Sequence, residues 1–189
     1  MKKLSLVVVC LLIAVLSAKA QYKFAPLDVS PADIEYFPFD AAHKKLTPQI
    51  KVVYSRPFKK GREIFGDTIG LQRYGKVWRI GANEETEIKF YSAVTMGGKQ
   101  FAAGTYALYA IPYKDKWTII VNSILDKWGY YYDIDKMVQT DLLRFDVPTK
   151  ALDNVVEALS ITFIPISGGT SMVIGWDKTA AEIPITFVK

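Results

Sequence analysis

Apolar and polar residues alternate over much of the chain beyond residue 49. Ile50, Val52 and Tyr54 form the first clear alternation, and Arg56-Pro57 ends it. A period of two is typical of strands that bury one face. Later runs share this pattern or are continuously apolar, and turn residues bound them: 77–80, 85–92, 93–96, 99–101, 105–111, 117–122, 142–147, 156–166, 172–176 and 182–188. From these runs we predict about eight or nine mainly antiparallel strands.

Glycine pairs and loop-like segments separate the predicted strands. Gly97-Gly98 supplies the positive φ that a tight hairpin requires, and Gly168-Gly169 offers a second turn. Residues 59–75 and 125–137 are predicted to be loops, and no segment keeps a helical period for more than about two turns. The pattern therefore predicts a single all-β domain over residues 49–189. The expected architecture is a β-sandwich or a partly open barrel.

Residues 21–48 precede this domain and contain four prolines. Each proline fixes φ and removes a backbone donor, so long regular structure is not expected there. We predict an extended lead-in with one short edge strand near residues 34–37.

The first 20 residues have a different pattern. Lys2 and Lys3 precede an apolar run over residues 4–16, and Ser17 to Ala20 provide a small-x-small site. The run is shorter than the roughly 20 residues of a spanning helix, so it predicts a signal peptide cleaved after Ala20. Gln21 stands where a lipoprotein signal would have cysteine. We therefore expect a periplasmic or secreted protein of a Gram-negative bacterium, without a stable membrane anchor after cleavage.

Removal of this segment changes what the composition implies. It takes away Cys10, the only cysteine, and the three lysines Lys2, Lys3 and Lys19, which lowers the formal net charge from +5 to +2. The mature chain would have no disulfide or thiol chemistry. Its low charge and its export argue against nucleic-acid binding.

A cationic and aromatic stretch stands out from this weakly basic background. Within residues 56–79 lie seven cationic side chains: Arg56, Lys59, Lys60, Arg62, Arg73, Lys76 and Arg79. Because guanidinium groups bind carboxylate or phosphate in bidentate fashion, we predict a site for a small anionic ligand, with Arg56, Lys60, Arg62, Trp78 and Arg79 as candidates. The alternative is structural: Arg56, Arg62 and Arg79 would pin the loop through backbone carbonyls and neighbouring glutamates.

Other candidate chemistry lies next to this stretch or in the aromatic segment after residue 125. Asn83 and Glu84 follow Arg79, and Glu84 could act as an acid or base, although a salt bridge to Arg79 is the simpler interpretation. Trp128 could stack on a sugar or fill the core. His43 is the single histidine and lacks the partners of a metal site, and no phosphate loop or dinucleotide fingerprint is present. We therefore expect no metal and no cofactor.

Several blocks resemble an exported bacterial family of unknown function, numbered twenty-nine-eleven. The resemblance rests on Tyr54-Ser-Arg-Pro with Lys60-Gly-Arg62, on Tyr74-Gly-Lys-Val-Trp-Arg79 with Gly81-Ala-Asn-Glu84, and on Ala103-Gly-Thr-Tyr-Ala-Leu108. It implies export and an all-β fold and transfers no catalytic residue. Arg73 stands where the family pattern leads us to expect proline, which adds a cation to the loop.

Three functions remain open from the sequence. The first is a non-catalytic binding or accessory protein for an anionic or carbohydrate-like small molecule. The second is a metal-independent hydrolase or isomerase that uses Glu84 with Arg79. The third is a structural or protein-contacting module of the cell envelope.

Overall fold

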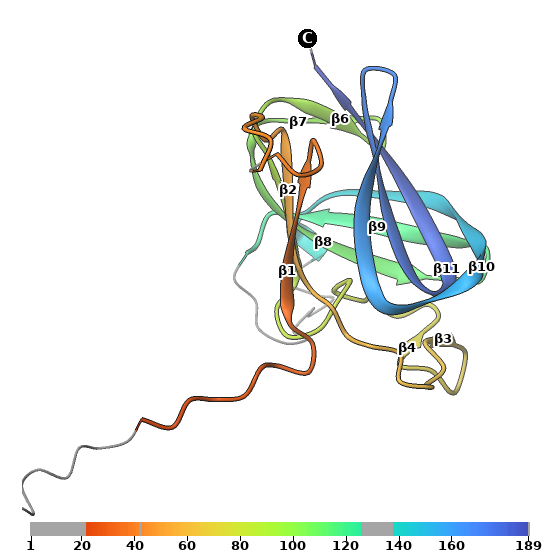
Figure 1. Ribbon diagram of the computed structural model, residues 1–189. Coiled ribbons are helices and arrows are strands. Elements are labelled where there is room, and N and C mark those ends of the chain that lie inside the picture. Colours follow the sequence, from red (N-terminus) through yellow and green to blue (C-terminus); the bar gives the residue numbers. More distant parts are fainter. Residues whose placement is uncertain (1–21, 42, 126–137, 189) are drawn as a thin grey trace, which may run out of the picture.

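The computed structural model describes residues 22–41, 43–125 and 138–188. Within these residues, nine strands form one sheet in the order β1-β2-β5-β8-β9-β10-β11-β6-β7, and β3 pairs with β4 in a second sheet (Figure 1). The elements are β1 (Ala32–Phe37), β2 (Ile50–Ser55), β3 (Phe65–Gly66), β4 (Gln72–Arg73), β5 (Thr86–Phe90), β6 (Val94–Met96), β7 (Lys99–Phe101), β8 (Gly104–Pro112), β9 (Lys116–Asn122), the 3-10 turn η1 (Val138–Thr140), β10 (Asp141–Ile166) and β11 (Gly169–Phe187). The all-β prediction is confirmed, with the large sheet bent but not closed into a barrel.

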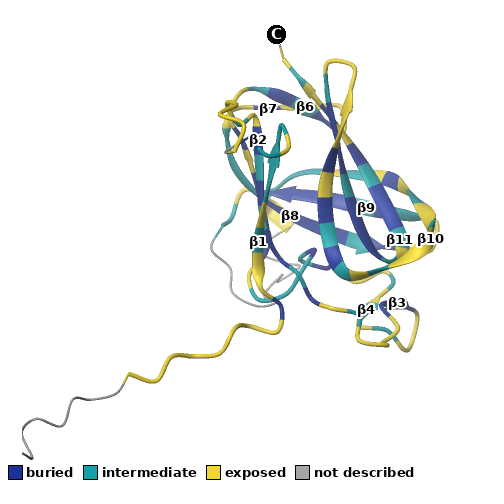
Figure 2. Cartoon of the chain, viewed as in Figure 1, coloured by how far each residue is buried: buried dark blue, intermediate teal, exposed yellow. Residues whose placement is uncertain are grey.

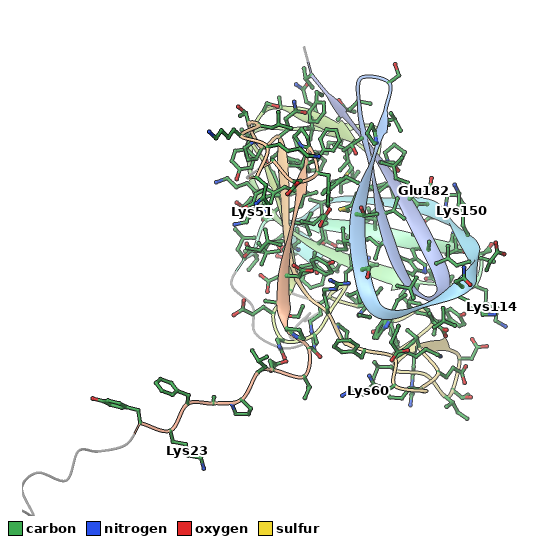
Figure 3. All side chains as sticks on the ribbon, viewed as in Figure 1. Lys23, Lys51, Lys60, Lys114, Lys150 and Glu182 are labelled. Carbon is green, nitrogen blue, oxygen red and sulfur yellow. The ribbon has the colours of Figure 1, made fainter. Side chains whose placement is uncertain are left out.

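The bend lets one sheet enclose its own core. Ile50, Val52 and Tyr54 of β2 are buried, as their alternation predicts, and the long β10–β11 hairpin faces them across the core (Figures 2 and 3). Phe37 of β1 packs against Phe163 of β10, with ring centroids 6.0 Å apart. Strands far apart in the strand order therefore share one hydrophobic core.

The two strands of the long hairpin are the main departure from the sequence prediction. Residues 142–147 and 156–166 belong to one strand, β10, and residues 172–176 and 182–188 fall largely within β11. The first part of β10 pairs with β9, whereas its later part pairs with β11 across register shifts between Ala151 and Ser160. The polar residues of this middle section look like a turn in the sequence, but they face solvent on a continuous strand.

The predicted strand over 77–80 is wrong, because this segment makes only an isolated bridge between Trp78 and Ala110 of β8. The predicted loop over 59–75 contains the two-residue strands β3 and β4, which pair in parallel. The hairpin at Gly97-Gly98 is confirmed, with φ values of 55° and 78°.

The irregular part of β10 supports the start of the loop that follows β2. Glu157 and Leu159 fall within the register shifts, and their backbones pair with residues 57–59 instead of with β11. The nitrogen of Lys59 donates to the carbonyl of Glu157 at 2.7 Å, and the nitrogen of Leu159 donates to the carbonyl of Pro57 at 3.0 Å. Bulges expose backbone groups in this way.

The lead-in extends away from the sheet before it reaches β1 (Figure 1). Tyr22, Phe24 and Leu27 are each more than 80% exposed. Over the described parts of the chain, no helix has the length and hydropathy needed to cross a membrane.

Candidate functional site

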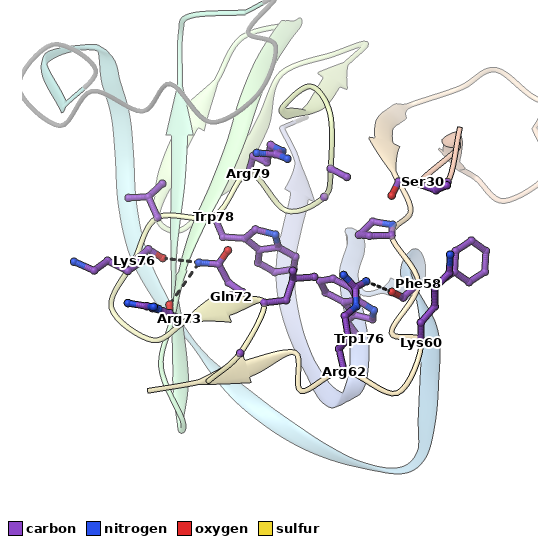
Figure 4. A pocket seen from close by; sticks show the side chains of 17 residues that line it. Ser30, Phe58, Lys60, Arg62, Gln72, Arg73, Lys76, Trp78, Arg79 and Trp176 are labelled. Atoms are coloured by element: carbon purple, nitrogen blue, oxygen red, sulfur yellow. Dashed lines mark hydrogen bonds between the residues drawn. The ribbon is translucent and has the colours of Figure 1, made fainter. Parts of the chain in front are cut away.

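A cleft of about 740 Å³ lies beside the loop that joins β2 to β5 (Figure 4). Residues 57–62 and 70–79 contribute its walls, Trp176 of β11 contributes to its floor, and Val29, Ser30, Gly81 and Ala82 complete its lining. Pockets of roughly 300–1,000 Å³ hold small-molecule ligands. The cleft is large enough for such a ligand.

Two tryptophans form the apolar floor. The rings of Trp78 and Trp176 lie 5.9 Å apart with an interplanar angle of 17°, and Trp117 meets Trp78 edge-on at 87°. Trp78 is 4% exposed and Trp176 is 1% exposed, so little of either ring is open to a ligand. Stacking on a sugar requires an open ring face. The floor therefore offers apolar contact and rigidity more than a stacking surface.

Lys60 and Arg62 stand on one wall, on the segment that docks against β10. Arg62 Nε donates to the carbonyl of Lys59 at 3.0 Å, and Arg62 Nη2 donates to the carbonyl of Phe58. The backbone nitrogen of Lys60 donates to Glu157 Oε1 at 2.8 Å. These bonds fix the turn and do not involve the Lys60 ammonium. Among the described residues, no ion pair of this ammonium is found.

Arg73 and Lys76 stand on the opposite wall in Figure 4. Gln72 lies between them and the floor, and its Nε2 is 3.3 Å from the carbonyl of Lys76 and 3.5 Å from that of Arg73. The nitrogen of Gly75 donates to the carbonyl of Pro112, which ties this turn to the end of β8. Both cationic side chains are on exposed residues.

Arg79 approaches the cleft from a third side. Trp78 anchors it to β8, because the backbone groups of Trp78 and Ala110 exchange hydrogen bonds of 2.7 and 2.8 Å. Ile80 follows at a φ of 55°, an unfavourable conformation for a β-branched residue. Thr86 holds this turn, since its nitrogen donates to the carbonyl of Arg79 and its hydroxyl to the carbonyl of Ile80.

The guanidinium of Arg79 is poorly satisfied in this position. Its Nε is buried, and no atom of the described residues accepts a hydrogen bond from it. Burial lowers the pKa of Arg79, and the nearby Tyr109 opposes this effect. Arginine stays charged at neutral pH, because a guanidinium does not lose its proton in proteins. A partly buried cation whose Nε has no hydrogen-bond acceptor among the described residues therefore borders the cleft.

The lead-in is tied to the opposite rim by Asn83. Asn83 Nδ2 lies 3.2 Å from Asp28 Oδ1, which also accepts from the backbone nitrogen of Ser30 at 2.7 Å. Asn83 has a φ of 59°, a left-handed conformation that asparagine tolerates better than most residues. Asn83 thus positions the rim without lining the cleft.

The charges around the cleft are of one sign. Among the described residues, the lining includes five cations and no aspartate or glutamate: Lys60, Arg62, Arg73, Lys76 and Arg79. Positive charges gathered at a partly apolar cleft attract anions and raise their local concentration there.

The sequence candidates separate into three groups. Lys60, Arg62, Trp78 and Arg79 line the cleft together. Arg56 does not, because it bonds Asp33 at 2.7 Å and the carbonyl of Leu159 at 3.0 Å, as the structural alternative expected of a loop anchor. Asn83 lies at the rim, Glu84 is exposed and outside the lining, and Trp128 lies outside the described residues.

The candidate residues predicted from the sequence did not include Trp176, Arg73 or Lys76. Trp176 is buried, and it also reaches the cleft. Its contact with Trp78 joins residues almost a hundred positions apart, which no local pattern could indicate. The local excess of cations over residues 56–79 was the one sequence signal that could have indicated Arg73 and Lys76.

The described residues contain no group of three or more histidine, cysteine, aspartate or glutamate side chains placed to hold a metal ion. His43 is exposed and lies 3.8 Å from Asp40 Oδ1.

Comparison with protein families gives one result. Residues 39–185 match the model of the family described as a protein of unknown function, DUF2911. The chain belongs to the DUF2911 family. No curated protein and no solved structure matches it.

The DUF2911 region includes every part of the cleft from Pro57 to Trp176. Val29 and Ser30, which complete the rim, precede the matched region. The walls and the floor of the cleft therefore belong to the family region.

Proposed function

We propose that this DUF2911 protein is a non-catalytic binding protein for a small anionic molecule. The observation that carries the proposal is the lining of the cleft, which among the described residues holds five cations and no carboxylate. Carboxylate and phosphate groups form charge-assisted hydrogen bonds with such side chains, and these bonds are stronger than neutral ones.

Arg79 supports ligand binding over a purely structural role for the loop. A structural arginine has its donors satisfied by the protein, as Arg56 does through Asp33, Leu159 and Ser160. Arg79 Nε is buried without an acceptor among the described residues. An unsatisfied buried donor costs about 1–3 kcal/mol, so structural hydrogen bonds of the loop do not explain the position of Arg79.

Binding also requires fewer assumptions than catalysis. Glu84, which the sequence offers as an acid or base for a hydrolase or isomerase, is exposed and is not part of the described lining. A general base must lie within hydrogen-bond reach of the proton that it removes. Glu84 therefore does not lie where it could remove a proton from a ligand in the cleft.

The proposal is tested by thermal-shift and calorimetric screening of residues 21–189 against monocarboxylates, sugar phosphates and neutral glycans. Anions that bind the native state raise the melting temperature by mass action, and neutral glycans do not. Arg79→Gln should remove the shift, whereas Arg144→Gln on β10, outside the cleft, should keep it. No shift with any anion at millimolar concentration, or an equal shift in Arg79→Gln, contradicts the proposal.

We further propose that binding takes place outside the cytoplasm. The proposal is supported by the charged start, the short apolar run and the small residues before Gln21. Cell fractionation and N-terminal sequencing of the full chain test it, with deletion of residues 2–20 as the control. The expected mature chain begins at Gln21 in the periplasm or the medium, and an intact chain in the cytoplasm would contradict the proposal.

A further inference from the structure

The five cations of the cleft form three sets on separate segments. Lys60 and Arg62 lie on the segment docked to β10, Arg73 and Lys76 lie on the turn held by Gln72, and Arg79 follows the bridge to β8. Figure 4 shows the first two sets on opposite sides of the tryptophan floor, with Arg79 on a third side. The positive charge is therefore distributed around the cleft instead of being gathered at one point.

Each set is held in place by backbone contacts of its own segment. Arg62 bonds the carbonyls of Lys59 and Phe58, and Gln72 holds the carbonyls of Arg73 and Lys76. Arg79 follows the bridge of Trp78 to Ala110. These anchors hold the three segments in separate places, so each set of cations occupies its own side of the cleft. One set can bind one acidic group of a ligand, and the remaining sets can then bind a second acidic group.

Apolar side chains line the cleft beside the three sets. Pro57, Leu71 and Val77 belong to the same wall segments as the cations, and Trp78 and Trp176 form the floor. Such a surface gains free energy from an apolar or ring-shaped ligand body, by about 25 cal/mol for each Å² removed from water. A small inorganic anion would leave this surface unused.

We propose that the ligand is a small molecule with an apolar or ring-shaped body that carries two separate acidic groups. This inference rests on the anion-binding function proposed above and specifies the class of ligand. One acidic group binds Arg79 at the inner side of the cleft. The second group binds a wall set, either Arg73 and Lys76 or Lys60 and Arg62, and the body covers the apolar floor.

Matched pairs of probes test the requirement for a second acidic group. We would titrate residues 21–189 with benzoate and benzene-1,3-dicarboxylate, and with glucose 6-phosphate and glucose 1,6-bisphosphate. In the better-binding pair, the dianionic member should bind at least about tenfold more tightly, as expected for one added charge-assisted contact. Its advantage should shrink as salt increases, because the wall cations are exposed.

Variants assign the two acidic groups to their cations. Arg79→Gln should weaken both members of the pair. The double variants Arg73→Gln with Lys76→Gln, and Lys60→Gln with Arg62→Gln, remove one wall each, and at least one should abolish the advantage of the dianion while the monoanion still binds. Lys89→Gln with Arg144→Gln removes the same charge outside the cleft and should keep the advantage.

The outcomes separate this inference from the function on which it rests. If the monoanion and the dianion bind equally and Arg79→Gln weakens both, the anion site stands and the two-group ligand is wrong. If neither wall variant reduces the advantage of the dianion, the inference is also overturned. If no anion binds, both the proposed function and this inference fail.

Discussion

At the scale of single residues, Arg79 and Ile80 combine two unfavourable features. Arg79 has a buried Nε without an acceptor among the described residues, and Ile80 has a φ of 55° while fully buried. Strained or unsatisfied residues often cluster at functional sites, where the surrounding structure holds them. Here Thr86 holds both carbonyls of the turn. The pair is therefore a local cost in stability.

The first prediction separates stability from binding at Arg79. Arg79→Met should raise the free energy of unfolding by about 1 kcal/mol, because it removes an unsatisfied donor and keeps the apolar stem. The same change should abolish anion binding. Urea denaturation of the unliganded protein and calorimetry with the anion measure the two effects. A loss of stability would show that Arg79 has a structural role.

The second prediction concerns Glu35 on β1. Burial raises its pKa above the ordinary value of 4.5, Asp33 raises it further, and Arg56 opposes both. Just above pH 4.5 the folded state then binds more protons than the unfolded state, so Glu35 makes stability fall as pH rises through this range.

Glu35→Gln should remove this loss. The variant should be more stable than the parent at about pH 7, and the difference should shrink below about pH 4, where the parent carboxyl is protonated in both states. Urea denaturation at a series of pH values measures the difference. A difference that does not vary with pH would show that titration of Glu35 is not its cause.

At the scale of elements, the register shifts of β10 determine where one wall of the cleft lies. They leave Glu157 and Leu159 open to pair with residues 57–59. Arg56 reinforces this junction, because it joins Asp33 of β1 to Leu159 and Ser160 of β10. The sequence could indicate that Arg56 was unusual, but its partners lie 23, 103 and 104 positions away.

The third prediction follows from this anchoring role. Arg56→Gln should lower the free energy of unfolding by about 2 kcal/mol, since it removes three hydrogen bonds at a partly exposed site. The affinity for the anion, measured by calorimetry well below the melting temperature, should change less than about threefold, because Arg56 lies outside the cleft. A large loss of affinity with unchanged stability would place Arg56 in the binding site.

At the scale of the whole molecule, one sheet folds over its own core and the lead-in joins the rim of the cleft from outside. Phe37 of β1 packs on Phe163 and Phe187, from strands far along the sheet order. Within residues 22–30 of the lead-in, Asp28 and Ser30 bond Asn83, whereas Tyr22, Phe24 and Leu27 are exposed. The two parts of the lead-in should therefore differ in importance.

The fourth prediction compares two truncations. A chain that begins at Leu27 should keep both the melting temperature and the anion affinity of residues 21–189. A chain that begins at Pro31 loses the contacts of Asp28 and Ser30 with Asn83, so it should lose about 1 kcal/mol of stability and bind the anion more weakly. Thermal denaturation and calorimetry distinguish these results. Equal behaviour of the two truncations would show that the rim does not depend on the lead-in.

The sequence by itself determined the all-β class, the hairpin at Gly97-Gly98, the buried face of β2 and four residues of the cleft. These features depend on local signals, namely the period of burial, the backbone freedom of glycine and an excess of cations within one loop.

Only the tertiary structure decided which cations face the same cleft. Arg56 and Arg62 look alike in the sequence, yet Arg56 finds Asp33 while Arg62 bonds its own turn and borders the cleft. The continuity of β10 and the meeting of Trp78 with Trp176 depend in the same way on distant partners. The physical reason is that packing and hydrogen bonding between segments far apart in the chain leave little trace in the local pattern of either segment.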